Sequence, residues 1–307
     1  MQKKPKKKLY KSHWPLFLML SPGILYLIIN NYIPMSGIII AFKKINFSKG
    51  IWASPFVGFE NFKFLFATND AWIITRNTIL YNLAFIIVNT IIGIAIAILI
   101  TEVRNSRLKK FYQSIILLPF LMSMVILSYI SFALLSTENG LVNNTILSFF
   151  NVEPISWYST PKYWPAILII ANCWKGVGYG CLIYIASLIG IDPAFYEAAR
   201  LDGATKWQEI TKITIPCLVP TIITLTLLSI GRIFFSDFGL FYQVPMNSGI
   251  LFPTTNVIDT YVYRALIEQG NIGMSSAAGV FQSCVGFVIV MGSNWMVRKI
   301  NKENALF

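Results

Sequence analysis

Six long apolar segments recur along the chain and constrain its fold more than any other feature. They cover residues 14–42, 71–100, 113–135, 163–190, 215–240 and 275–297. A helix needs about 20 apolar residues to cross the hydrocarbon core of a bilayer, and in lipid a helix satisfies its own backbone hydrogen bonds. The sequence therefore predicts an all-α membrane protein with six transmembrane helices.

The composition agrees with a chain that lies mostly within lipid. Only 12% of its 307 residues are charged, whereas soluble domains usually carry about 25%, and the mean hydropathy is +0.62. The length leaves room for six spans with short loops but not for a large soluble domain. We therefore expect one multi-pass domain over residues 14–297, surrounded by lipid.

Lysine and arginine residues predict how the bundle is oriented. The stretch at residues 1–13 holds six lysines directly before the first apolar segment. We interpret it as a cytoplasmic anchor rather than a nucleic-acid-binding tail, so no nucleic-acid partner is expected. The loops after the second and fourth segments and the cytoplasmic tail at residues 298–307 are also basic, which predicts an N-in/C-in orientation. Four lysines of the first outer loop do not fit this pattern: Lys43, Lys44, Lys49 and Lys63.

The loop at residues 192–215, between the fourth and fifth apolar segments, predicts a compact pair of short helices. Asp192 can cap a first helix, and the Glu-Ala-Ala run at 197–199 continues it with strong helix formers. Gly203 allows a sharp turn where a side chain would clash. A second, amphipathic helix follows, and Pro216 then begins the fifth membrane helix.

This loop resembles the coupling loop of importer-type ABC transporter permeases. The signature of that family is Glu-Ala-Ala, three residues, Gly, nine residues and then Ile-x-Leu-Pro. The residues here that match it, with the aspartate before the glycine, are Glu197, Ala198, Ala199, Asp202, Gly203, Ile213 and Pro216. Ile215 stands where the family usually has leucine. The run over 196–204 is similar to the carbohydrate-uptake branch, and other stretches resemble its LplB-type permeases for polysaccharide fragments: 20–26, 32–42, 50–58 and 256–264.

The resemblance implies a type I ABC importer permease fold in the bacterial cytoplasmic membrane and the import of oligosaccharides. It also implies three partners: a second homologous permease subunit, an ATPase dimer and a lipid-anchored solute-binding protein outside the membrane. The chain contains no Gly-Lys pair, which the phosphate-binding loop of such ATPases requires. We therefore expect no catalytic residue and no cofactor on this chain, with ATP and Mg bound by the partner ATPase. In this interpretation Glu197 makes the ionic contact with the ATPase.

Polar residues within the apolar segments are candidates for the substrate pathway, because such groups are costly in lipid unless they face a partner or a wet cavity. Lys175 lies in the fourth segment, and Arg232 and Asp237 lie in the fifth. The aromatic neighbours that can stack on sugars are Trp174, Tyr179 and Phe235. Two alternatives stay open for the cations. They brace the bundle by pairing with carboxylates or backbone carbonyls, or they line the path of an acidic, uronate-containing polysaccharide fragment.

Small and amide residues within the segments add three expectations. Asn82 and Asn89 share one face of the second segment, where they either hydrogen-bond between helices or face the channel. The run over residues 176–180 contains a G-x-x-x-G pair, which predicts close helix packing. The cysteines have no metal-ligand spacing, so we interpret all four as small core residues with no metal site. They are Cys173, Cys181, Cys217 and Cys284.

Three other functions compete with this interpretation. Ion-coupled secondary transporters usually show paired broken helices in two related halves, which the sequence does not show. A membrane-embedded enzyme needs convergent carboxylates, histidines or a metal cluster, whereas the acidic residues here are scattered. An ABC permease for a non-sugar solute remains an alternative, against which only the sugar-type run around Glu197 argues.

Overall fold

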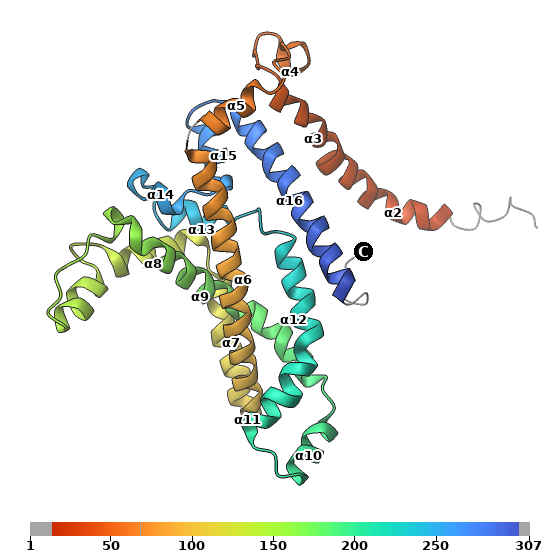
Figure 1. Ribbon diagram of the computed structural model, residues 1–307, viewed down its shortest axis with the longest axis vertical. Helices are drawn as coiled ribbons and strands as arrows, with labels where there is room; N and C mark the ends of the chain where they lie inside the picture. The colour runs from red at the N-terminus through yellow and green to blue at the C-terminus, as the bar shows by residue number, and fades with distance from the viewer. Residues whose placement is uncertain (1–13, 68, 301–307) are drawn as a thin grey trace, which may run out of the picture.

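The computed structural model describes residues 14–67 and 69–300, which fold into helices and connecting loops (Figure 1). Within this part, five helices are long and apolar enough to cross a membrane, and a bent pair of helices makes a sixth. The five extend over Trp14–Phe42, Asp70–Glu102, Pro161–Ile189, Lys206–Ile230 and Ile272–Lys299, and the bent pair is Ser106–Leu121 with Met124–Leu135. The predicted all-helical membrane architecture is confirmed. The basic stretch at 1–13 and the end of the tail, residues 301–307, lie outside the described residues.

Two long helices form the central axis of the molecule. α6 (Asp70–Glu102) and α9 (Trp164–Ile189) pack along each other, and α7 (Ser106–Leu121) packs on α9. Two apolar cores hold this axis together, one around Trp164 and the other around Cys181. Figure 1 shows α6 running through most of the length of the molecule, so that side chains along it connect the two ends.

Other elements flank this axis. α12 (Ile215–Ile230) contacts α6 and α9, while α16 (Ile272–Ile300) contacts α12 and α15 (Ile258–Ile267). Short helices form the connections: α4 (Gly50–Ala53), α5 (Glu60–Ala67), α10 (Pro193–Leu201), α11 (Lys206–Glu209), α13 (Phe238–Gln243) and α14 (Phe252–Thr255). Single 3₁₀ or π turns lie at Val142–Leu147, Trp157–Ser159, Pro161–Tyr163 and Gly249–Leu251. α10 and α11 lie at one end of the molecule, called here the α10 end, and α4 lies at the opposite end (Figure 1).

The first segment is one long helix with two irregular stretches. α2 (Trp14–Leu27) leads through a π-helical turn (Ile28–Tyr32) into α3 (Ile33–Met35) and a 3₁₀ helix (Ser36–Phe42). The irregular stretches flank Pro34, whose missing N–H interrupts the regular hydrogen-bond ladder. The 3₁₀ end packs on α16, whereas no residue of α2 is buried and α2 leans away from the bundle (Figure 1).

The predicted third span, residues 113–135, is divided into two helices by a bend. The helix begins earlier, as α7, and then bends by 95° into α8 (Met124–Leu135). Pro119 weakens the last turn of α7 because proline has no N–H to donate, and the Ser123 side chain caps the start of α8. A weakened helix end followed by a new N-cap divides one apolar segment into two helices.

The predicted fifth span, residues 215–240, is wrong at both ends. One continuous helix extends over Lys206–Ile230 and includes α11, a π-helical turn and α12, so Pro216 lies inside this helix and does not begin it. The π-helical turn directly precedes this proline, which cannot donate to the regular ladder. Beyond the helix, Arg232 and Asp237 lie in the non-helical stretch that joins α12 to α13.

One lysine that did not fit the charge pattern has a structural role. Lys43 is only 7% exposed, and its Nζ donates to the carbonyl oxygens of Ile51 (3.2 Å) and Trp52 (2.6 Å). These carbonyls end the short helix α4, where a cation is favourable. Lys43 therefore closes the loop between the first two apolar segments on itself.

Candidate functional site

Polar side chains from α6, α9 and α12 surround a cavity of about 600 Å³ beside the central axis. Five residues of the predicted substrate pathway line this cavity: Asn82, Asn89, Tyr179, Arg232 and Phe235. Further lining residues include Phe85, Thr90, Asn172, Tyr184, Leu228 and Ser229. The fold thus brings together side chains from three apolar segments that are far apart in the sequence.

The two asparagines of α6 both bond to other elements and line the cavity. Asn89 Nδ2 donates to Asn172 Oδ1 at 2.9 Å, and Asn82 Nδ2 donates to the carbonyl oxygen of Ile233 at 3.0 Å. Asn89 Oδ1 is buried and has no hydrogen-bond partner among the described residues. An unsatisfied buried acceptor is costly, and Asn89 Oδ1 is shielded from solvent in this structure.

The stretch between α12 and α13 is held by side chains from three other helices. Asn82 of α6 donates to Ile233, Gln282 Nε2 of α16 donates to the carbonyl oxygen of Phe234 at 2.7 Å, and Ser236 N donates to Asp259 Oδ2 of α15 at 2.7 Å. Burial raises the pKa of the Asp259 carboxyl, and the hydrogen bond from Ser236 opposes that rise. These bonds satisfy backbone groups of a stretch that has no regular helical ladder of its own.

Arg232 and Phe235 belong to this held stretch and face the cavity. Arg232 is exposed, and no carboxylate lies within ion-pair distance of it in the part of the chain that the structure describes. The Phe235 ring is 45% exposed and the Tyr179 ring 53%. The cavity therefore combines a cation, amides and exposed aromatic rings.

Three other predicted pathway residues do not line the cavity. Lys175 Nζ donates to the carbonyl oxygens of Phe120 (3.1 Å), Pro119 (3.4 Å) and Met122, so its ammonium group caps the end of α7 at the bend. Asp237 caps α13 through a hydrogen bond from Leu240 N at 3.2 Å. Trp174 is partly exposed outside the cavity.

Small residues of the fourth segment pack differently from the prediction. The expected close contact is made by Gly178, where a Cβ would lie 2.0 Å from the carbonyl oxygen of Ile116 on α7. Gly176 and Gly180, the predicted pair, have nothing within 4 Å of an added Cβ.

The core interpretation holds for the two cysteines of α9 but is wrong for two others, which are exposed: Cys217 and Cys284.

At the α10 end, the loop at residues 192–215 folds as two helical pieces around a sharp turn. Asp192 Oδ1 accepts from Ala194 N at 2.9 Å and caps α10, and Gly203 has φ +80°, a conformation that favours glycine. The second piece begins with a capping box between Thr205 and Gln208. The predicted geometry of this loop, with a helix cap and a glycine turn, is therefore present.

The exposed surface of this loop carries large apolar side chains. Phe195, Leu201 and Trp207 are 58%, 90% and 73% exposed. Glu197 is exposed and forms no ion pair with a described residue. The remaining residues predicted to couple to an ATPase are distributed as follows: Ala198, Asp202 and Pro216 are exposed, and Ala199 and Ile213 are half-buried. A cluster of exposed large apolar side chains on a helical tip is typical of a surface that binds another protein.

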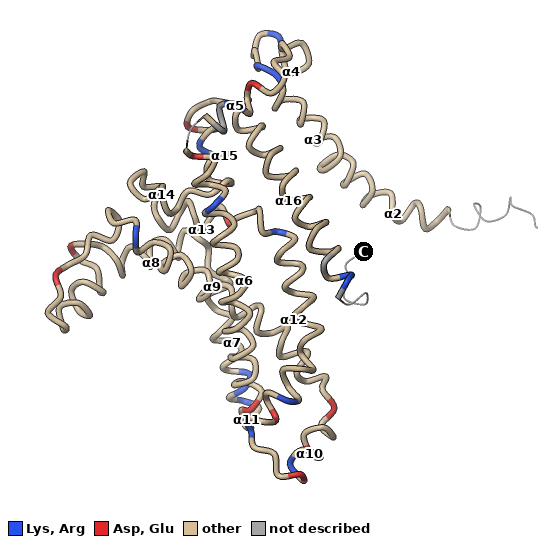
Figure 2. Tube along the Cα trace, viewed as in Figure 1, with Lys and Arg blue, Asp and Glu red and all other residues tan. Residues whose placement is uncertain are grey.

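Charged residues gather at the same end. Figure 2 shows Lys and Arg at the start of α7 and around α10 and α11, with acidic residues among them. Sequence reasoning did not select the acidic residues Glu102 and Glu209, nor the cavity residues Asn172 and Ser229. Each is a polar residue in or beside an apolar segment, and that signal could have identified them.

Comparisons with known proteins agree with this arrangement. Residues 73–302 match the family described as binding-protein-dependent transport system inner membrane component. The chain is 33% identical to protein LplB of Bacillus subtilis, covering 96% of this chain and 92% of LplB. It is 34% identical to the polygalacturonan/rhamnogalacturonan transport system permease protein YteP of the same organism, covering 94% of this chain and 89% of YteP.

A solved structure shares the whole fold. The crystal structure of a bacterial ABC transporter involved in the import of the acidic polysaccharide alginate contains a chain with 34% identity and a TM-score of 0.86, covering 95% of this chain and 97% of that one. A second structure of a bacterial alginate ABC transporter, in complex with alginate pentasaccharide-bound periplasmic protein, matches with 33% identity and a TM-score of 0.87 over 97% of this chain and 99% of that one. The chain therefore belongs to the family of binding-protein-dependent transport system inner membrane components, the permease subunits of ABC importers.

Proposed function

We propose that this chain is a translocation subunit of an importer that carries acidic oligosaccharides across the bacterial cytoplasmic membrane into the cytoplasm. The observation that carries the proposal is the cavity-lining guanidinium of Arg232, which has no ion-pair partner among the described residues. A sugar carboxylate supplies that partner. Amides such as Asn89 bind hydroxyl groups, and the rings of Tyr179 and Phe235 stack on the apolar faces of the sugar. The similarity to YteP and to a chain of the alginate importer supports this substrate class.

ATP is hydrolysed by a separate ATPase subunit that binds the loop at residues 192–215. The exposed apolar side chains of this loop, with the outward-facing Glu197, support such an interface. Closure of the ATPase dimer moves the loop, and the loop moves α9 and α12, between which it is held. ATP and Mg stay on the ATPase, and this chain contributes no catalytic residue. The α10 end then faces the cytoplasm, as the N-in/C-in orientation requires.

A second permease subunit completes the pathway, and a solute-binding protein delivers the sugar from outside. The leaning position of α2, none of whose residues is buried, supports the second permease, because a helix detached from its own bundle has one side free for another chain. The similarity to a transporter solved with its periplasmic protein supports the solute-binding protein. Purification of the native complex tests this composition. Two different six-helix chains, an ATPase and a binding protein are expected, and a complex without an ATPase would contradict the proposal.

Gly203→Val is expected to uncouple ATP hydrolysis from transport, whereas Gly203→Asn retains most activity. No atom lies within 4 Å of an added Cβ, so the strain comes from φ +80° alone. That conformation costs an ordinary residue about 1–2 kcal/mol, valine more because it is β-branched, and asparagine less. Sugar uptake and substrate-stimulated ATPase activity of the reconstituted complex measure the effect. Normal values for both in Gly203→Val would show that this turn does not couple the two processes.

A further inference from the structure

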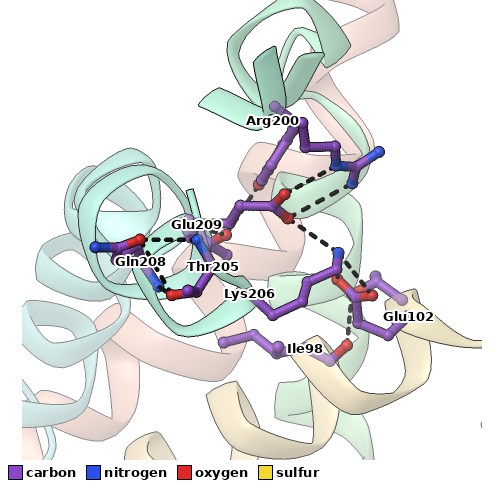
Figure 3. Close-up of polar contacts among 10 residues, drawn as sticks. Ile98, Glu102, Arg200, Thr205, Lys206, Gln208 and Glu209 are labelled. Atoms are coloured by element: carbon purple, nitrogen blue, oxygen red, sulfur yellow. Dashed lines mark hydrogen bonds and ion pairs between the residues drawn. The ribbon is translucent and has the colours of Figure 1, made fainter. Parts of the chain in front are cut away.

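We propose that an ion cluster centred on Glu209 is the strut that ties the loop at residues 192–215 to α6, an inference that rests on the proposed coupling function of this loop. Figure 3 shows the cluster. Arg200 Nε donates to Glu209 Oε1 at 2.8 Å, and Lys206 Nζ donates to Glu209 Oε2 at 2.9 Å. The same Lys206 Nζ lies 3.1 Å from the carboxylate of Glu102. One chain of ionic contacts therefore connects three helices.

The position of Glu102 determines which membrane helix this cluster connects to the loop. Glu102 is the last residue of α6, where a carboxylate is unfavourable because the C-terminal end of a helix carries partial negative charge. Lys206 offsets that charge and binds the end of α6 to the loop. Farther along the same rigid helix, Asn82 and Asn89 line the cavity. When the loop moves, α6 moves with it, and the wall of the cavity that α6 forms is displaced. This route does not require a movement of α9 or α12.

The burial of Glu209 distinguishes this cluster from ordinary surface ion pairs. Exposed pairs contribute little, and Arg200, Lys206 and Glu102 are all exposed enough to be solvated singly. Glu209 is only 3% exposed, and a carboxylate that is withdrawn from water is stable only with its charge partners in place. Glu209 also raises the pKa of the Arg200 guanidinium. Both cations therefore converge on the one buried carboxylate and connect their helices through it.

Glu102 offers a test that leaves the loop itself intact. Glu102→Gln removes only the contact with α6, because the pairs that Glu209 makes with Arg200 and Lys206 remain. In the reconstituted complex we expect the number of sugars imported per ATP hydrolysed to fall about two- to fivefold, in line with the loss of one exposed ion pair, with basal ATPase activity unchanged. Glu209→Gln is expected to lower the ratio at least as far. Glu153→Gln makes the same chemical change at an exposed site away from the cluster and should leave the ratio unchanged.

A distance measurement separates a strut from a merely stabilising contact. Spin labels at Leu201→Cys and Arg104→Cys, both exposed positions, report the separation of the loop tip and the end of α6 after Cys217 and Cys284 are replaced by serine. In the wild-type background we expect the same separation in the nucleotide-free and the ATP-trapped complex. In the Glu102→Gln background we expect the separation to differ between these two states.

The outcomes distinguish this inference from the proposed function. If both glutamine variants keep the wild-type transport ratio while Gly203→Val lowers it, the loop couples but the cluster is not its strut. If Gly203→Val also has no effect, the proposed function of the loop fails as well. A Glu102→Gln chain that does not assemble into the complex would assign the cluster to folding and would also overturn the inference.

Discussion

We expect Gly178→Ala to abolish most sugar uptake, while Gly176→Ala leaves uptake unchanged. A methyl group at Gly178 would lie 2.0 Å from the carbonyl oxygen of Ile116, a backbone atom that cannot rotate away, so α7 and α9 must separate. The separation would also weaken the contacts of Lys175 with the end of α7 and the stacking of Tyr179 on Phe120, whose ring centroids are 5.0 Å apart. Forcing extra volume into a packed contact typically costs about 1–3 kcal/mol.

The two glycines make a matched pair because they lie two residues apart on the same helix. Alanine is the better helix former by about 1 kcal/mol at either position, so intrinsic propensity alone predicts that both variants are stabilised. Gly176 has open space around an added Cβ. The yield and melting temperature of the purified complex, together with uptake in proteoliposomes, measure the difference. Equal behaviour of the two variants would mean that α7 and α9 are not packed at this point.

Arg232→Gln is expected to reduce import of an acidic oligosaccharide by about tenfold or more, because one hydrogen-bonded contact to a charged group contributes about 1.5–3 kcal/mol. The side chain faces the cavity without an ion-pair partner among the described residues. Its removal therefore leaves no carboxylate of the chain unpaired there, and the bundle should fold normally. Uptake of a uronate-containing and a neutral oligosaccharide of the same length is compared in the same proteoliposomes.

The neutral sugar and a conservative variant serve as controls for this experiment. Import of the neutral sugar by Arg232→Gln should change little, and Arg232→Lys should retain part of the acidic-sugar uptake because the charge remains without its planar fork. Equal loss or equal retention for both sugars would contradict a role of Arg232 in recognising charge. The selectivity between sugars, rather than the total rate, is the decisive quantity.

Sequence reasoning identified about a third of the cavity-lining residues, for a physical reason. Polar residues such as Asn89 and Arg232 stand out in apolar segments because lipid penalises them. The same signal also selected Lys175, whose charge is used to cap a broken helix, and it could not separate these two uses. Which use a cation serves depends on where backbone carbonyls become free, and that depends on the bend between α7 and α8.

The sequence by itself determined the class of the protein, its apolar segments and the turn of the loop at residues 192–215. These features are local: the hydropathy of a segment, the helix cap at Asp192 and the glycine at φ +80° each depend on interactions within a few residues of the chain. The tertiary structure alone decided where helices break and which polar groups meet. Three contacts join residues that are distant in sequence: the close packing of Gly178 on Ile116, the hydrogen bond from Asn89 to Asn172, and the ion pair of Glu102 with Lys206 in the loop. Such contacts arise only when packed helices bring free backbone or charged groups into reach, and periodicity along one segment carries no information about that.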